Sequence, residues 1–219
     1  MLTLHTAGLL LTAAPGAAPV PGGAVAVDGD TIVAIGAYEE VAAAHPGARV
    51  RRWPGVLTPG LRQWHTQWLL GQAYHPDPRE YDELGDRMLT GERLAALEMT
   101  ESRRSGSVRR GLQRMLGHGT TAVAVTGGFR DPVVSTAVAR SGLRVVPALL
   151  APGILIDAPD LDPLREGRDL RGSVEEPLAV GARADLAVFD VPDEAALLEA
   201  GAGTCVATVL AGRLVYRRR

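Results

Sequence analysis

The sequence predicts an α/β fold: strand-rich segments at both ends of the chain and, between them, a parallel sheet of alternating strands and helices. Two observations predict it. Residues 1–54 and 178–219 carry apolar and β-branched runs punctuated by Gly and Pro, as strands and turns do. Between them, apolar runs over 55–61, 120–126 and 143–150 are separated by helical patterns. Such a βαβαβ succession winds right-handed into a parallel sheet.

The amino-terminal segment contains a hairpin signal. Asp28-Gly29 lies between the β-branched runs 24–27 and 31–35, and this dipeptide favours a two-residue hairpin turn. The other elements expected before residue 54 are a strand over 1–11, a turn region over 15–23, a helix over 38–44 and a strand over 49–53.

Two helices are expected in the middle of the chain. The first, over 90–116, has an apolar face at helical spacing and a possible break near Ser105-Gly106. The second runs over 131–140; it opens with Asp131-Pro132, because Pro is favoured in a first turn, and Gly142 caps its end. Residues 70–90 are expected to form a loop, since prolines and glycines interrupt any long element.

Residues 151–177 contain several prolines and no usable period, which predicts a linker or a loop that covers the sheet. Beyond them, the expected elements are strands over 184–190, 205–210 and 213–216 and a helix over 193–200. We therefore expect three parts: the strand-rich segments 1–54 and 178–219, the strand–helix unit 55–150, and the connecting segment 151–177.

Composition narrows the function classes. The net charge of −2 gives no electrostatic case for nucleic acid or an anionic membrane. All 23 basic residues are Arg, which excludes lysine-based chemistry. A single cysteine, Cys205, excludes an intramolecular disulfide, fits a cytoplasmic location and is expected to be buried and inert. The apolar first 27 residues have no basic start and several prolines, so we expect mature structure rather than a signal peptide.

The stretch from Gly55 to Leu69 carries a family resemblance. An apolar pair is followed by Pro59-Gly60 and then by His65, and this resembles the first barrel strand of the amidohydrolase superfamily, in its imidazolonepropionase-like and deaminase-like branch. Three further segments resemble the same family in the right order: 116–123, 141–146, and the closing pair 180–190 with 209–216. The resemblance implies one sandwich built from both termini. It also implies a truncated barrel, since 151–180 leave no room for the missing units.

His65 is the leading site candidate. In the family, a His-x-His pair binds metal that polarises the attacking water, but this chain has Gln67 at the second position. A catalytic zinc takes about three protein ligands, and no histidine follows His118. The alternatives are one divalent metal, zinc or iron, held by His65, or no metal, with His65 hydrogen-bonded in a remnant pocket. No intact binuclear site is expected.

The other candidates each have two interpretations. Trp64, Gln67 and Trp68 flank His65 and are expected to contact substrate. His75 could approach them from the following loop or lie on the surface. Asp131 could be catalytic at a strand end, or it could cap the helix that follows. His5 and His45 are expected on the surface of the sandwich, and His118 at a helix end.

Two function classes follow. One is a divergent hydrolase of non-peptide C–N bonds in a small molecule such as a cyclic amide, an amidine or an aminated nucleoside. The other is a non-catalytic scaffold or partner of a complete enzyme. Because a three-stranded sheet leaves edges and apolar faces exposed, we expect a homodimer, with the 151–177 segment as the competing cover.

Overall fold

The computed structural model describes residues 1–148, 159–165 and 169–218. It divides into two compact units: the first holds residues 1–62, 116–122 and 162–219, and the second holds 63–115 and 123–161. Both terminal segments thus belong to the first unit. The three-part division expected from the sequence stays a prediction.

A four-stranded sheet in the first unit has the order β5-β4-β1-β6. Its strands are β1 (Thr3–Thr6), β4 (Gly23–Asp28), β5 (Thr31–Ala37) and β6 (Arg49–Arg52). β1 pairs antiparallel with β4 and parallel with β6. β4 and β5 form the predicted hairpin, and Gly29 in their turn has φ +61°, which glycine adopts without strain. Helix α1 (Tyr38–Ala44) follows, with the bounds predicted from the sequence.

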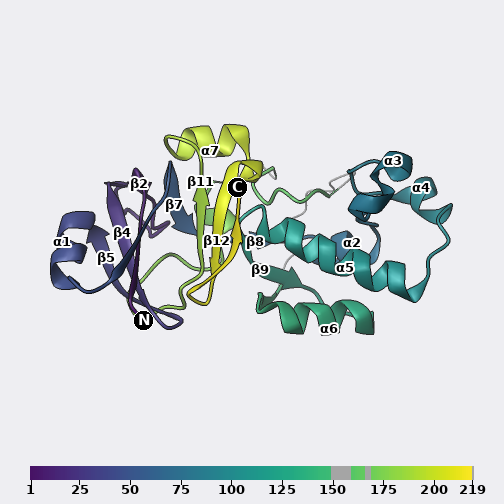
Figure 1. The fold of residues 1–219 in the computed structure, drawn as a ribbon, viewed down its shortest axis with the longest axis horizontal. Helices are drawn as coiled ribbons and strands as arrows, with labels where there is room; N and C mark the ends of the chain where they lie inside the picture. The colour runs from purple at the N-terminus through teal and green to yellow at the C-terminus, as the bar shows by residue number, and fades with distance from the viewer. Residues whose placement is uncertain (149–158, 166–168, 219) are drawn as a thin grey trace. The chain divides into compact units, whose positions relative to one another are not determined.

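A six-stranded sheet joins the two ends of the chain. Its order is β13-β12-β11-β7-β2-β3, and it is made of β2 (Leu9–Leu10), β3 (Val20–Pro21), β7 (Val56–Pro59), β11 (Leu186–Phe189), β12 (Cys205–Leu210) and β13 (Arg213–Arg217). The central strand β7 pairs antiparallel with β11 and parallel with β2. The composite sheet predicted from both termini is confirmed (Figure 1).

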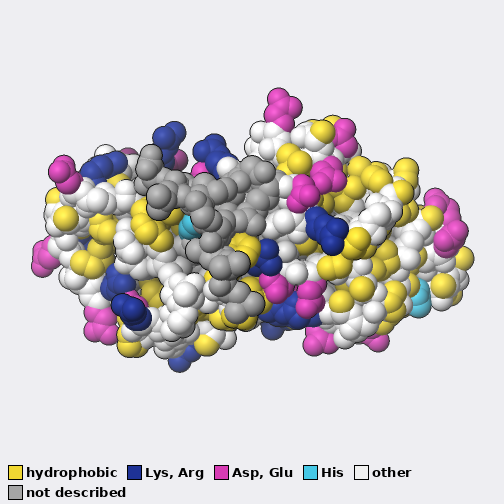
Figure 2. Space-filling model, turned by 180° about the vertical axis from the view of Figure 1, so that it is seen from behind, with side chains coloured by type: hydrophobic (Ala, Val, Ile, Leu, Met, Phe, Trp, Pro, Cys, Tyr) yellow, Lys and Arg dark blue, Asp and Glu magenta, His cyan; other side chains and the backbone are white. Residues whose placement is uncertain are grey.

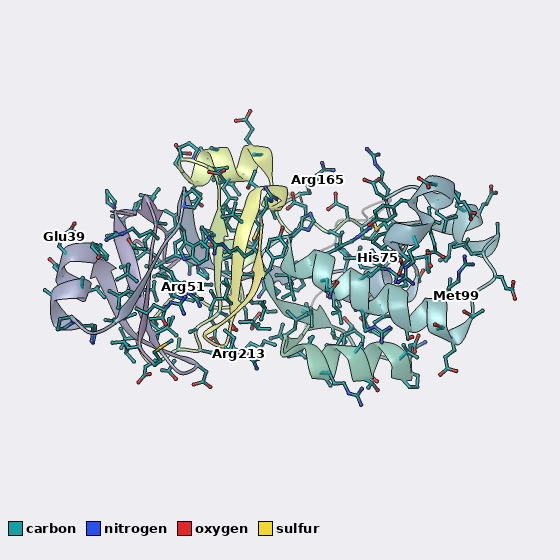
Figure 3. All side chains as sticks on the ribbon, viewed as in Figure 1. Glu39, Arg51, His75, Met99, Arg165 and Arg213 are labelled. Atoms are coloured by element: carbon teal, nitrogen blue, oxygen red, sulfur yellow. The ribbon has the colours of Figure 1, made fainter. Side chains whose placement is uncertain are left out.

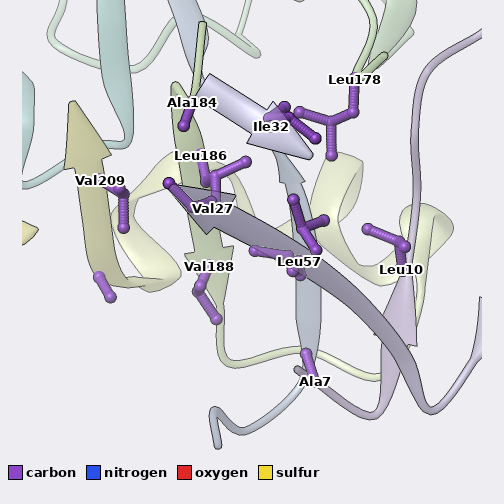
Figure 4. Packing of buried hydrophobic residues seen from close by; sticks show 12 residues of the cluster. Ala7, Leu10, Val27, Ile32, Leu57, Leu178, Ala184, Leu186, Val188 and Val209 are labelled. Carbon is purple, nitrogen blue, oxygen red and sulfur yellow. The ribbon is translucent and has the colours of Figure 1, made fainter. Parts of the chain in front are cut away.

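The core of the first unit lies between these two sheets. Strands of both sheets contribute its side chains, which include Val25, Val27, Ile32, Leu57, Leu186, Val188 and Val209 (Figure 4). Burying one such aliphatic side chain contributes roughly 1.5–3 kcal/mol. A second cluster covers the other face of the six-stranded sheet, where Phe189 and Cys205 meet Leu197 of α7 (Glu194–Ala200). The described part of the 151–177 segment adds Leu164, Leu170 and Val174 to this cluster.

Two segments that were each predicted to be one strand form two strands in the structure. The expected strand over 1–11 is β1 and β2, which belong to different sheets. The expected strand over 55–61 is β7 and β8 (Leu61–Gln63), and β7 belongs to the composite sheet rather than to the parallel one. Glycines mark both divisions: Gly8 lies against the Gly55 carbonyl, and a Cβ on Gly60 would overlap the Thr121 side chain.

The parallel sheet contains β8, β9 (Thr120–Val125) and β10 (Arg144–Pro147), with β9 in the centre. The Leu61 N–H donates to the Gly119 carbonyl at the strand starts (2.8 Å), and the Ala148 N–H donates to the Val125 carbonyl at the ends (3.0 Å). β9 is buried throughout, as its apolar sequence predicts for a parallel strand. Helix α6 (Pro132–Ser141) follows it and ends at Gly142, whose φ of 78° matches the predicted cap.

The helix expected over 90–116 is two helices, α4 (Gly91–Ala95) and α5 (Glu101–Leu116). The break lies at 96–100 rather than at Ser105-Gly106, because the Thr100 hydroxyl accepts a hydrogen bond from the Arg103 N–H at the start of α5. Residues 66–84 contain short helices where mostly loop was expected: α2 (Thr66–Gly71), a 3₁₀ turn over Pro78–Glu80 and α3 (Tyr81–Leu84).

Within the described ranges, every helix is too short or too polar to span a bilayer. On the face drawn in Figure 2, charged side chains of both signs are interspersed with apolar ones. The cytoplasmic location expected from the sequence stays a prediction.

Gly55 provides a test of the composite sheet. It has φ +63°, and a Cβ there would overlap the Phe189 carbonyl of β11 and approach the Val191 nitrogen. We expect Gly55→Ala to lower the free energy of unfolding by at least about 3 kcal/mol, from backbone strain and overlap together.

The matched control is Gly29→Ala, since Gly29 has φ +61° but open space around it. Gly29→Ala should lower the free energy of unfolding by only about 1 kcal/mol, which is the cost of the left-handed backbone alone. Chemical denaturation of both variants measures the difference; equal costs would contradict the close approach of Gly55 to β11.

Candidate active site at the carboxyl edge of the parallel sheet

His65 lies two residues after the end of β8 and immediately before α2, at the carboxyl end of a parallel strand. Its backbone N–H donates to the Oε1 atom of Gln63 at 3.0 Å. The Gln63 Nε2 in turn donates to the carbonyls of Asp160 and Leu161, both at 3.3 Å. Gln63 is buried, so these bonds hold the chain that carries His65 in place. Sequence reasoning missed Gln63, whose partners lie almost one hundred residues away.

Gln67 does not present a free amide at this edge. Its Nε2 donates to the carbonyls of Thr126 (3.0 Å) and Gly128 (2.8 Å), and its Oε1 accepts from the Thr126 N–H at 3.2 Å. These bonds tie the first turn of α2 to the carboxyl end of β9. Gln67 therefore joins two backbone segments.

Trp64, His65 and Trp68 are all partly exposed around this edge. Trp64 and His65 precede α2 and Trp68 lies within it, so one short turn of chain carries all three. The structure thus keeps together the residues that the sequence pattern grouped around His65. Whether they contact a substrate stays a prediction.

Asp131 is the N-cap of α6, one of its two interpretations from the sequence. Its Oδ1 accepts from the Val133 N–H at 2.8 Å, and its Oδ2 accepts from the Nε of Arg104 at 2.8 Å and from the Nη2 of the same residue. Burial raises the pKa of this carboxyl, but the bonds from Arg104 and Val133 outweigh it and lower the pKa overall. Both oxygens thus bind protein groups; a catalytic role for Asp131 stays a prediction.

His75 is fully buried, so its expected place on the surface of a loop is wrong. Its Nε2 lies 3.0 Å from the Leu69 carbonyl, its backbone N–H donates to the Ser107 hydroxyl at 2.8 Å, and its carbonyl accepts from Arg110 Nε at 2.8 Å. Figure 3 shows it beside α5. Gly111 of α5 makes the room, because a Cβ there would lie 2.8 Å from the imidazole. Burial lowers the pKa of His75 to about 4.

A polar network beside His75 was also missed. The Tyr74 hydroxyl donates to Glu80 Oε2 at 2.5 Å, and Arg103 binds Glu80 Oε1 at 2.8 Å. Burial, followed by the bond to Glu80, raises the pKa of Tyr74 to about 12. The signal in the sequence was Asp77-Pro78-Arg79-Glu80, because Asp77 and Glu80 form a capping box across this turn.

Two predictions for the first unit have opposite outcomes. His5 on β1 is fully buried rather than on the surface, because its Nδ1 accepts from the Trp53 Nε1 at 3.2 Å and its ring stacks on Trp53. Cys205 is buried as expected, and burial raises the pKa of its thiol. A small pocket of this unit is lined by residues 11–19 with Leu170, Arg171 and Glu194, and no sequence-predicted site residue lies in its wall.

The described residues do not fit a bound metal ion. Residues 1–148, 159–165 and 169–218 contain no group of three His, Cys, Asp or Glu side chains that could hold one. A catalytic zinc takes about three such ligands. Next to His65, the Gln67 carbonyl oxygen already accepts a hydrogen bond from Thr126. We therefore derive no reaction step through a metal.

The class of fold is defined by a sandwich built from both termini and by a parallel sheet whose first strand, β8, leads to His65. Within it, residues 23–48, which hold β4, β5 and α1, match the family model of the bacterial imidazolonepropionase-like composite domain. The resemblance found in the sequence is confirmed for this segment. A search of curated proteins finds no match.

Several solved structures are similar to the chain. Ochratoxinase from A. niger has a TM-score of 0.44 and 19% identity, over 67% of this chain and 31% of its own. An adenosine deaminase from Xanthomonas campestris has a TM-score of 0.42 and 20% identity, over 66% of this chain and 33% of its own. An amidohydrolase from an environmental sample of the Sargasso Sea has a TM-score of 0.41 and 22% identity, over 82% of this chain and 39% of its own. The chain spans 31–39% of the length of these three.

The Gln67 bonds predict a stability effect. Gln67→Ala removes three hydrogen bonds that join α2 to the end of β9. Since each net bond contributes about 0.5–1.5 kcal/mol and this side chain is partly exposed, we expect a loss of roughly 1–2 kcal/mol. Urea unfolding measures it. The control is Gln113→Ala, an exposed position of α5, which should cost under about 0.5 kcal/mol; equal losses would contradict the role of Gln67.

The buried histidines predict a pH dependence. His5 and His75 both have their pKa lowered from 6.5 to about 4 in the folded chain. Between these values the unfolded chain binds more protons, so their contribution is present above pH 6.5 and is lost as the pH falls toward 4. Each contributes on the order of 3 kcal/mol.

We expect His75→Gln, which keeps a donor for the Leu69 carbonyl, to flatten this dependence by about half, since His5 still titrates. Stability measured from pH 7 to 4 tests this. His45→Gln, at a partly exposed position, should leave the slope unchanged. A His75→Gln slope equal to that of the parent chain would rule out His75 as the source.

Proposed function

We propose that this chain carries the chemistry of an imidazolonepropionase-like amidohydrolase: hydrolysis of a non-peptide C–N bond in a small molecule. The substrate class is a cyclic amide, an amidine or an aminated nucleoside. The observation that carries the proposal is the position of His65, at the carboxyl end of a parallel strand and directly before a helix. Reacting groups of α/β folds gather at that end of the strands. The composite-domain match over 23–48 supports the same class.

In this proposal the His65 imidazole accepts a proton from the water that attacks the substrate carbon, and it returns that proton to the nitrogen as the C–N bond breaks. The indole rings of Trp64 and Trp68 provide apolar walls for a small heterocycle. Gln67 and Asp131 do not touch the reacting atoms in this proposal. Their hydrogen bonds position the backbone at Thr126, Gly128 and Val133, beside which the substrate would lie. His75 is buried, and its contact with the Leu69 carbonyl helps to hold α2 in place.

A second candidate is a non-catalytic scaffold or a partner subunit of a complete enzyme. The bonding of Gln67 and Asp131 favours it, because two side chains at the strand ends bind backbone and arginine groups instead of facing a ligand. In a scaffold, the same bonds would stabilise the fold and need no substrate.

We further propose that the chain pairs with a second copy of itself. β10 is an edge strand of the parallel sheet, and its Val145 is 52% exposed. An exposed, apolar edge strand invites pairing with another strand. A second copy is also one source of further groups near His65.

Turnover by the purified chain distinguishes the two candidates. The hydrolase should release ammonia, or the ring-opened acid, from at least one member of a panel of cyclic amides, amidines and aminated nucleosides. His65→Ala should lower that rate at least about a hundredfold, because it removes the proton acceptor.

His45→Ala is the control and should keep the rate of the parent chain, since His45 follows α1 in the first unit. No turnover by the parent chain, or an equal rate in the His65→Ala variant, would count against the hydrolase and favour the scaffold.

A further inference from the structure

Three arginines gather at the rim of the composite sandwich, and we call them the arginine cluster: Arg49, Arg51 and Arg217. Arg49 and Arg51 lie two residues apart on β6, so their side chains leave the same face of that strand. Arg217 ends β13. Both strands are edge strands of their sheets. Arg49 and Arg217 are exposed and Arg51 is partly exposed, so a ligand can reach all three.

Trp53 brings the two strands of the cluster together. The guanidinium carbon of Arg217 lies 5.8 Å from the centroid of the Trp53 ring. The same ring stacks on His5, with centroids 6.1 Å apart and planes 15° from parallel. His5 is in turn the strand partner of Arg51 across the β1–β6 ladder. Packing against Trp53 therefore positions the Arg217 charge, and the β1–β6 ladder sets the position of the Arg51 backbone.

This arrangement is electrostatically unfavourable in the free chain. Partial burial lowers the pKa of Arg51, and the nearby Arg49 and Arg217 lower it further. Within the described residues, none of the three forms an ion pair with a carboxylate, whereas Arg62, Arg103, Arg104 and Arg110 all do. The pKa of His5, held near 4 by burial and by Arg51, keeps that imidazole neutral, so it adds no charge at neutral pH.

We propose that the arginine cluster binds a small ligand that carries at least two negative charges, phosphate or carboxylate. A guanidinium matches the oxygen pairs of both groups, and several together favour a multivalent anion over chloride. An anion here would relieve the repulsion among three like charges. This site lies in the composite sandwich and does not depend on the hydrolase proposal.

Thermal unfolding of the full chain tests the site, with pyrophosphate and citrate as separate probes and sodium chloride at equal ionic strength as the reference. We expect one or both probes to raise the melting temperature beyond the chloride reference. A shift with pyrophosphate alone identifies a phosphate ligand, and a shift with citrate alone identifies a polycarboxylate. No shift with either anion would overturn the proposal.

Arg51→Gln should bind the active probe at least about tenfold more weakly in titration calorimetry. Without ligand it should melt no lower than the parent chain, because it removes a repulsive charge; a purely structural arginine would melt lower. Arg217→Gln, at an exposed position, is the second variant if Arg51→Gln folds poorly.

Arg213→Gln is the matched control, an exposed arginine on the same strand as Arg217 (Figure 3). It should retain the affinity of the parent chain. Equal weakening in Arg213→Gln and in the cluster variants would indicate non-specific charge attraction and overturn the site.

Discussion

The pairing of β7 with β11 is the contact on which the rest of the structure depends. Val56–Pro59 lies antiparallel to Leu186–Phe189, and both strands are buried along their whole length. β7 also pairs with β2, so one short strand joins the amino-terminal and carboxyl-terminal parts of a single sheet. The same strand leads directly into β8 and His65.

Local signals in the sequence predicted local structure well. Asp28-Gly29 specified the hairpin, and helix α1 has the predicted bounds because Pro46-Gly47 ends its pattern. The divisions at Gly8 and Gly60 could not be predicted in this way, because they depend on which sheet each half joins. The burial of His5 and His75 is likewise set by partners distant in sequence, Trp53 and Ser107. Polarity alone favoured the surface for both.

At the candidate site, the sequence predicted where the side chains lie in the fold better than it predicted what they bind. His65, Gln67 and Asp131 all lie near strand or helix ends, as expected. Their bonding was not predictable, because Gln67 binds backbone groups at Thr126 and Gly128 and Asp131 binds Arg104. The amide of Gln67 thus serves to hold backbone groups together.

The composite sheet has a consequence for how the chain acquires its fold. β2 and β7 lie within the first 60 residues, but the partner of β7 begins at Leu186. During synthesis, the edge of β7 that pairs with β11 therefore stays unpaired until Leu186–Phe189 has been made. Contacts of such sequence separation slow folding and extend the period in which aggregation competes. The pairing that unites the termini is thus a long-range step in the folding of the chain.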